Sequence, residues 1–295
     1  MYRELITHPH VASFSALLFL AFFAAWFLAR WNAGLIRVER RHIDNQALLL
    51  VACSMFGARF FSWLFYFPSG TNFWKAMTAV SGGLVFYGGV IFAVVAVVGY
   101  ALLRKVSLRR LANIWAAPVA LGLAIGRVGC FMAGCCWGDA CMPADRGTDI
   151  VDSVARRQVF TLSLLSGSRF PLAVRFPAET GAYEQHRELG LIPAGSTASL
   201  PVHPAQLYEA VAVLLLALFL QRKFMRYPND ASLLPMLALG YGIIRFLVEF
   251  LRADNPPIYF GLTLSQVISL IFISWALIER CTARTTVGVP EAHLS

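Results

Sequence analysis

Seven long apolar runs constrain the fold of this chain more than any other feature of its sequence. They cover about residues 11–30, 47–67, 80–103, 111–133, 205–221, 232–252 and 260–278. A helix needs about 20 mostly apolar residues to cross the hydrocarbon core of a bilayer, so runs of this length are typical of transmembrane helices. Hydrophobic residues make up 58% of the chain and charged residues 14%, which excludes a disordered protein and argues against a soluble enzyme. We therefore predict an all-α polytopic membrane protein with seven transmembrane helices.

The distribution of lysine and arginine predicts the orientation of these helices. Short cytoplasmic loops are enriched in both residues, whereas loops beyond about 60 residues cross the membrane largely regardless of charge. Thirteen basic residues follow spans one, three, five and seven: Arg30, Arg37, Arg40, Arg41, Arg104, Lys105, Arg109, Arg110, Arg222, Lys223, Arg226, Arg280 and Arg284. Outside the long connection, the opposite side carries only Arg3, Lys75 and Arg252. We therefore predict an external N-terminus and a cytoplasmic C-terminus, with residues 134–204 as a small external head on a single membrane domain of residues 1–295.

The ionisable side chains that fall deep inside the predicted spans include Arg59, Arg127, Arg245 and Glu249. A charge at the centre of a membrane helix costs roughly 2.5–3.5 kcal/mol, so such residues usually face a site, a partner or water. At about 1.5 Å rise per residue, the three arginines lie roughly 9–12 Å below the outer surface, each on a different helix. Guanidinium groups bind phosphate through paired hydrogen bonds, so we expect a cationic pocket that opens outward and binds a phospholipid head group. The alternative is that each arginine pairs with a carboxylate and only stabilises helix packing.

The sixth span places several polar residues on one helix face. Tyr241, Arg245, Glu249 and Arg252 follow one another at i, i+4, i+8 and i+11, a spacing that brings side chains onto one side of a helix. Glu249 is one turn from Arg245 and is expected to neutralise it. This helix face carries one acidic group and several basic and hydroxyl groups. We therefore expect positive charge on it to remain available for a ligand.

Two segments near the predicted outer surface carry further polar groups. Tyr87 stands between glycine pairs at the start of the third span, where glycine either allows close helix packing or lets backbone line a cavity. The start of the fifth span holds His203, Gln206, Tyr208 and Glu209 within seven residues, more polar groups than helix capping requires. His203 is the histidine that we consider as a proton acceptor.

Four of the six cysteines fall within twelve residues at the outer end of the fourth span: Cys130, Cys135, Cys136 and Cys141. Paired C-x-x-C spacing is absent, so we expect no metal site here. An oxidising exterior favours a disulfide among them, and a thiol near Arg127 is alternatively expected to be reactive because the cation lowers its pKa. We expect Cys53 and Cys281 to be inert. We also expect no cofactor. We expect no nucleic-acid partner either, because no basic and aromatic face remains once the topology is assigned.

The motifs together resemble one family, the bacterial prolipoprotein diacylglyceryl transferases. The resemblance rests on GLVFYGG at 83–89, GRVGCFMAGCCWG at 126–138, HPAQLYE at 203–209, YGIIRFLVEFLR at 241–252 and LSQVIS at 264–269. The segment GARFFSWLFY at 57–66 is also similar to the family's second span. These stretches touch six of the seven spans in the family's order, and the topology derived from charge is the family's own.

The resemblance implies transfer of a diacylglyceryl group from phosphatidylglycerol to the lipobox cysteine of a secreted prolipoprotein, at the outer face of the bacterial inner membrane. It implies catalytic roles for Arg127 and Arg245, which would bind the phosphate, and for Tyr87 and His203. The residues expected to bind substrate are Arg59, Gly88, Gly89, Cys130, Gly138, Gln206, Tyr208, Glu209, Tyr241 and Glu249.

Three positions depart from the family pattern, and they leave a second hypothesis open. The family usually has His where Tyr87 stands, Asn where Cys130 stands and Glu where Cys135 stands. Tyrosine, with an ordinary pKa near 10, is a poorer base than histidine at neutral pH, and a thiol does not replace an amide as a hydrogen-bonding group. The alternative is a paralogue on the same scaffold, a lipid-binding or thiol-redox membrane protein that uses Cys130, Cys135 and Cys136.

Overall fold

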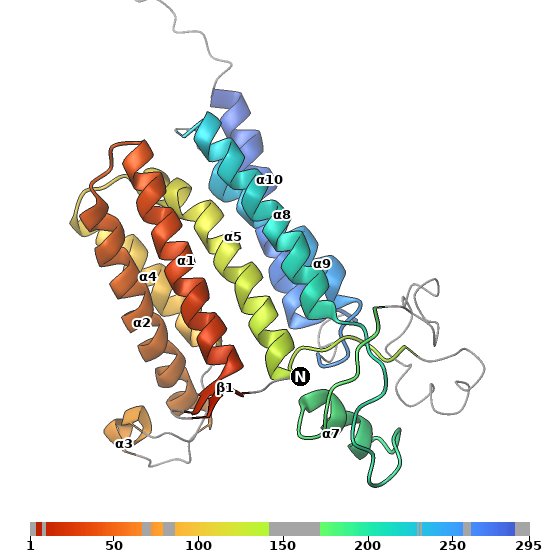
Figure 1. Ribbon diagram of the computed structural model, residues 1–295. Coiled ribbons are helices and arrows are strands. Elements are labelled where there is room, and N and C mark those ends of the chain that lie inside the picture. The colour runs from red at the N-terminus through yellow and green to blue at the C-terminus, as the bar shows by residue number, and fades with distance from the viewer. Residues whose placement is uncertain are drawn as a thin grey trace, which may run out of the picture. The chain divides into compact units, whose positions relative to one another are not determined.

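The computed structural model describes residues 4–7, 10–66, 72–78, 86–141, 172–228, 230, 232–255 and 261–286. Within these ranges the chain is mainly helical (Figure 1). The helices are α1 (Ser13–Leu35), α2 (Arg40–Tyr66), α3 (Phe73–Thr78), α4 (Phe86–Leu103), α5 (Leu108–Ala133), α7 (Gly181–Glu188), α8 (Ala205–Arg226), α9 (Leu233–Glu249) and α10 (Leu264–Thr286). A short antiparallel pair, β1 (Glu4–Thr7) and β2 (His10–Ala12), precedes α1. Apart from this short pair, the elements of the described ranges are helices, in agreement with the predicted all-α class.

Four helices in the described part of the chain are long and apolar enough to cross a membrane. They are α1, α2, α5 and α10, and Gly88–Leu103 of α4 forms a shorter apolar helix. The protein is therefore a polytopic helical membrane protein.

The described chain divides into two compact units. The first comprises Met1–Ala25, Ala116–Lys223 and Ser232–Ser295, and the second comprises Trp26–Trp115 and Phe224–Ala231.

Close contact between α2 and α4 forms the core of the second unit (Figure 1). A Cβ atom at Gly57 would collide with the backbone oxygen of Gly88, and the reverse also holds. At Gly89, a Cβ atom would lie 3.0 Å from the backbone oxygen of Ser54. These glycines therefore allow the two backbones to approach, which is the packing role that small residues play in membrane helices.

In the first unit, the helix α8 has one exposed apolar face and one buried polar face. Val211, Leu215 and Phe219 lie on one face of this helix and are 59%, 62% and 52% exposed. Gln206 and Glu209 are buried on the opposite side. Exposed apolar faces of this kind suit contact with lipid rather than with water. The helix α8 itself lies outside the four that meet the length and composition test.

The segment 172–204, which includes α7, packs against the ends of the first unit's helices. Phe176, Val202 and Ala182 form its small apolar core. The indole of Trp137, just after α5, donates to Gln185 at 2.8 Å, and Gln185 donates to the backbone oxygen of Ala253 at 3.3 Å. The rest of the predicted head, residues 142–171, lies outside the described residues.

Candidate functional site

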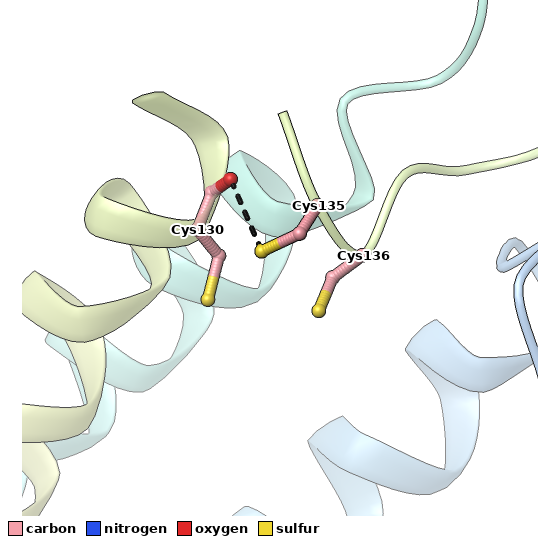
Figure 2. Close-up of side chains that lie close together, drawn as sticks. All are labelled: Cys130, Cys135 and Cys136. Atoms are coloured by element: carbon pink, nitrogen blue, oxygen red, sulfur yellow. Dashed lines mark hydrogen bonds between the residues drawn. The ribbon is translucent and has the colours of Figure 1, made fainter. Parts of the chain in front are cut away.

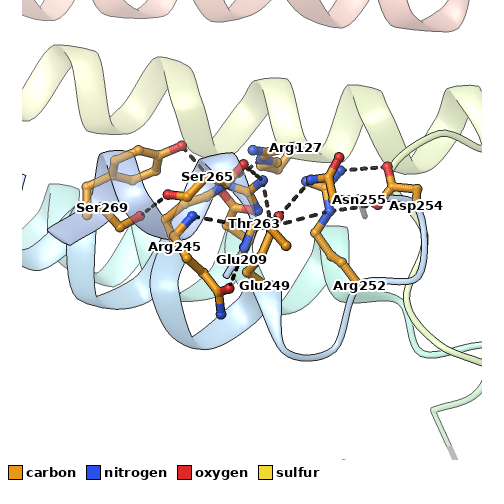
Figure 3. A network of polar contacts seen from close by, with 12 residues as sticks. Arg127, Glu209, Arg245, Glu249, Arg252, Asp254, Asn255, Thr263, Ser265 and Ser269 are labelled. Atoms are coloured by element: carbon orange, nitrogen blue, oxygen red, sulfur yellow. Dashed lines mark hydrogen bonds and ion pairs between the residues drawn. The ribbon is translucent and has the colours of Figure 1, made fainter. Parts of the chain in front are cut away.

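A single buried carboxylate joins two of the predicted arginines. Glu209 of α8 is 1% exposed, and its Oε1 lies 2.9 Å from Nε of Arg127 on α5. Its Oε2 lies 3.5 Å from Nη1 of Arg245 on α9, and Tyr241 donates its hydroxyl to Oε1 at 3.4 Å. Figure 3 shows the side chains of Arg127, Glu209 and Arg245 converging from separate helices. The structure thus brings together residues from three helices that lie far apart in the sequence.

A second carboxylate, Glu249, lies at the end of α9. Its Oε2 is 2.8 Å from Nη2 of Arg245, one turn earlier, as the i, i+4 spacing predicts. Its Oε1 accepts hydrogen bonds from Thr263 at 2.8 Å and from Asn255 at 2.7 Å. Arg252 lies 3.7 Å from Oε2. Glu249 is 3% exposed, and these contacts supply the partners that a buried charge requires.

The network extends into the connection between α9 and α10. Ser265 accepts a hydrogen bond from Nη2 of Arg245 at 3.0 Å, and Arg252 forms a paired contact with Asp254 at 2.9 and 2.6 Å. Sequence reasoning missed Asp254, Asn255 and Ser265 as site residues. For Asp254 and Asn255 the available signal was their position, because they are short polar residues directly beyond a helix face that already carries buried charges. Ser265 lies in the first turn of α10 and gave no such signal.

The network is charge-balanced among the described residues, which corrects the expectation of a net positive pocket. Its basic residues are Arg127, Arg245 and Arg252, and its acidic residues are Glu209, Glu249 and Asp254. The helix face of α9 alone predicts a positive remainder, but Glu209 comes from α8 and Asp254 from the following loop. Pairing between helices cannot be read from the spacing within one helix.

Gly138 is the backbone junction that holds the ends of these helices together. Its amide donates to the backbone oxygen of His203 at 3.0 Å, and it forms an isolated bridge with Arg252. A Cβ atom at Gly138 would lie 2.8 Å from the Cβ of His203 and 2.9 Å from the backbone oxygen of Leu251. Only glycine fits where three segments meet so closely.

His203 and Gln206 lie buried at the start of α8. The imidazole Nδ1 of His203 lies 3.3 Å from the hydroxyl of Tyr208. The amide nitrogen of Gln206 donates to the backbone oxygen of Cys135 at 2.6 Å. The Oε1 atom of Gln206 is buried and has no hydrogen-bond partner in the described part of the chain. An unsatisfied acceptor of this kind is costly in a folded protein unless a ligand uses it.

All six cysteines are free thiols, so the expected disulfide is not formed in this structure. Cys141 is buried, and burial together with the nearby Asp139 carboxylate raises its pKa to about 11. That thiol is therefore inert near neutral pH. The sulfur atoms of Cys130, Cys135 and Cys136 lie within 4.8 Å of one another.

The remaining predicted site residues lie in the second unit. Arg59 is on α2, Gly88 and Gly89 pack α4 against α2, and Tyr87 is in the first turn of α4, with its side chain outside the described residues. Their participation in one pocket with Arg127 and Arg245 stays a prediction.

The fold and the site define the class of protein: a polytopic helical membrane protein with a buried arginine and carboxylate network inside one of its units. Comparison with known sequences narrows this class. The chain belongs to the prolipoprotein diacylglyceryl transferase family, whose profile it matches over residues 4–280. This match confirms the resemblance drawn from the motifs, and it favours a transferase over the thiol-redox alternative.

Individual relatives carry the name phosphatidylglycerol–prolipoprotein diacylglyceryl transferase. The protein from Pasteurella multocida is 30% identical over 193 residues, which are 64% of this chain and 55% of that protein. The protein from Clostridium tetani is 22% identical over 263 residues, 89% of each chain. The protein from Cereibacter sphaeroides is 27% identical over 316 residues, 92% of this chain and 95% of that protein. The chain therefore spans about half the length of some relatives and about nine tenths of others.

Proposed function

We propose that this protein transfers the diacylglyceryl group of phosphatidylglycerol to the thiol of a lipobox cysteine in a secreted prolipoprotein. The observation that carries the proposal is the meeting of Arg127 and Arg245 on the single buried carboxylate of Glu209. The family match and the names of the relatives support the same reaction.

The reaction is a substitution at carbon. The thiol sulfur forms a bond to the terminal glyceryl carbon, and the bond between that carbon and the phosphate oxygen breaks. The electron pair stays on the oxygen, so glycerol phosphate leaves, and the thiol proton passes to a base. Negative charge grows on the departing phosphate ester, and fixed cationic donors in a water-poor site stabilise such charge most effectively.

Arg127 and Arg245 are the cationic donors in this proposal. A guanidinium has five N–H donors, and Arg127 contacts Glu209 through Nε. Glu209 acts as the positioning residue, because it holds two guanidinium groups from different helices at one point. Tyr241 supports Glu209 through its hydroxyl.

Gln206 supplies an acceptor for the head group. Its Oε1 is buried and unpaired in the described part of the chain, while its amide nitrogen is fixed on Cys135. A hydroxyl of the glycerol head group is a donor that would satisfy this oxygen. His203 accepts the thiol proton in this scheme, since histidine is the side chain best suited to carry a proton near neutral pH.

The protein acts in the bacterial inner membrane, with seven spans, an external N-terminus and its pocket open to the periplasmic side. The observed helices occur in each of the seven apolar runs of the sequence, and lysine and arginine are concentrated on one side of the resulting connections. The segment 134–204 lies outside the membrane in this topology.

The test is transfer of labelled diacylglycerol from phosphatidylglycerol to a lipobox peptide by the purified chain in detergent, with and without reductant. We expect transfer by the unmodified chain and a loss of at least about 100-fold in Arg245→Ala, the cost typical of removing one donor to a developing charge. Arg222→Ala is the matched control, because Arg222 is exposed on α8, away from the network. Transfer at the original rate by a folded Arg245→Ala variant would contradict the assigned role, and absence of transfer by the unmodified chain would overturn the function.

A further inference from the structure

Three cysteines at the end of α5 gather their sulfur atoms around one point. Cys130 is in the last turn of α5, and Cys135 and Cys136 are in the turn that follows. The three Sγ atoms lie within 4.8 Å of one another, all three thiols are free, and all are partly buried. Figure 2 shows the three side chains directed toward a shared space.

The backbone produces this grouping by a specific helix ending. The amide of Gly134 donates to the backbone oxygen of Phe131 at 3.1 Å, and the amide of Cys135 donates to that of Cys130 at 3.1 Å. Together with the φ of 69° at Gly134, these bonds form a Schellman motif, which reverses the chain over the last helical turn. Cys135 is thereby placed directly above Cys130, and its thiol donates to the Cys130 backbone oxygen at 3.6 Å.

Cys136 follows in a conformation that side chains rarely adopt. Its φ is 63°, in the left-handed region that favours glycine. In this conformation its thiol lies beside the other two rather than away from them. A strained residue that orients a reactive group is a common feature of functional sites.

Thiols bind a metal ion as thiolates, so a soft cation bound among the three sulfur atoms would release their protons.

We propose that Cys130, Cys135 and Cys136 bind one thiophilic metal ion, of the class of Zn²⁺ and Cu⁺, through three sulfur ligands. A metal–sulfur distance of about 2.3 Å requires sulfur atoms about 4 Å apart, so the cluster needs only small side-chain movements. Sulfur ligands select soft metals and disfavour Mg²⁺ and Ca²⁺, which take oxygen ligands. The paired C-x-x-C spacing is absent from the sequence. The Schellman turn instead brings the three sulfur atoms together.

The site is separate in chemistry from the proposed transfer, and binding is measured without any activity assay. The purified full-length chain, reduced with a phosphine and kept anaerobic, is loaded with Zn²⁺, Cu⁺ or Mg²⁺ and then desalted. We expect about one Zn²⁺ or Cu⁺ retained per chain, no retained Mg²⁺, and X-ray absorption showing sulfur ligands at about 2.3 Å. Retention of either Zn²⁺ or Cu⁺ by these thiols supports the proposal. The separate loading experiments with the two ions identify which one binds.

Serine variants locate the binding. The triple variant Cys130→Ser, Cys135→Ser, Cys136→Ser is expected to retain no metal, and each single variant to bind more than about 10-fold more weakly, since even outer partners of a metal contribute that much. The matched control is Cys281→Ser, because that thiol is exposed on α10 outside the cluster. Single variants decide the result if the triple variant fails to fold. Equal retention by the cluster variants and the control, or no retention of either soft ion by the unmodified chain, overturns the proposal.

Discussion

Glu209 illustrates how one side chain can determine the arrangement of several helices. It is almost completely buried and lies between Arg127 and Arg245, which come from different helices. Removal of one member of a buried ion pair leaves an uncompensated charge. An exposed pair, such as Glu184 and Arg187 at 2.6 Å on α7, has no such consequence because water solvates both groups.

Glu209→Ala should therefore destabilise the protein strongly. We expect a loss of about 3–5 kcal/mol in the free energy of unfolding, and about 0–1 kcal/mol for the control Glu184→Ala. Chemical unfolding of the detergent-solubilised protein, followed by circular dichroism, measures both. Similar losses in the two variants would show that the buried pair is not a stabilising contact.

His186 gives the segment 172–204 a dependence on pH. Its Nδ1 accepts a hydrogen bond from the amide of Leu200 at 3.2 Å, which requires the neutral imidazole. Burial lowers the pKa of His186 below its ordinary value of 6.5, although the Asp139 carboxylate acts in the opposite direction. The folded segment thus binds fewer protons than the unfolded one. Its stability is fully present above pH 6.5 and is lost as the pH falls below that value.

Hydrogen exchange of the amides in residues 172–204 tests this dependence. We expect protection, corrected for the intrinsic exchange rate, to fall between about pH 7.5 and about pH 5 in the unmodified chain. In His186→Gln the side chain still offers a hydrogen-bond acceptor but does not titrate. The protection of the amides in this variant should therefore not change over this pH range. A fall of the same size in both proteins would assign the effect to another group.

At the scale of elements, the contact of α2 with α4 depends on missing side chains. Gly57 and Gly88 lie so close that a Cβ atom on either would meet the other's backbone oxygen. Gly99, on the same α4 helix, has open space around it. An alanine at Gly57 therefore tests the packing of the two helices, whereas an alanine at Gly99 tests only the conformational effect of glycine within a helix.

Gly57→Ala should push the two helices apart and destabilise the second unit by about 1–3 kcal/mol, the usual cost of overpacking. Gly99→Ala should be neutral or stabilising by up to about 1 kcal/mol, because alanine favours the helix. Thermal unfolding of the two variants in the same detergent compares them. Equal shifts of the melting temperature would contradict the packing role.

The sequence predicts the elements of this protein better than the contacts between them. Apolar runs of membrane length are a local property, and helices lie in every predicted range because the backbone must satisfy its own hydrogen bonds in lipid. The face shared by Tyr241, Arg245 and Glu249 follows from helical spacing alone. The pairing of Arg127 with Glu209 and the convergence of three sulfur atoms depend on packing and on a helix-ending turn, which residue spacing does not reveal.

At the scale of the whole molecule, the proposed topology places α7 and the end of α10 on opposite sides of the membrane. Glu188 is exposed at the end of α7, and Cys281 is exposed near the end of α10. Arg280 and Arg284 lie at the predicted cytoplasmic end of α10. The two positions are therefore suited to measure orientation with a membrane-impermeant reagent.

In a background with the other five cysteines replaced by serine, Cys281 should react with an impermeant maleimide only after the spheroplasts are permeabilised. When Cys281 is also replaced and Glu188→Cys is introduced, the new thiol should react in intact spheroplasts. Mass spectrometry of the purified chains measures the labelled fraction. Labelling of Cys281 in intact cells would reverse the proposed orientation.

The separation of Arg127 from its partner along the chain has a consequence for biosynthesis. Arg245 is synthesised together with Glu249, which lies one turn away on the same helix. Arg127, by contrast, is synthesised before the whole 134–204 segment, and its carboxylate partner arrives only with α8. An unpaired arginine in a membrane helix is costly, so α5 is an unfavourable segment for the insertion machinery until α8 joins it. The ribosome completes the 134–204 segment first, and the core of this unit closes around its charges only afterwards.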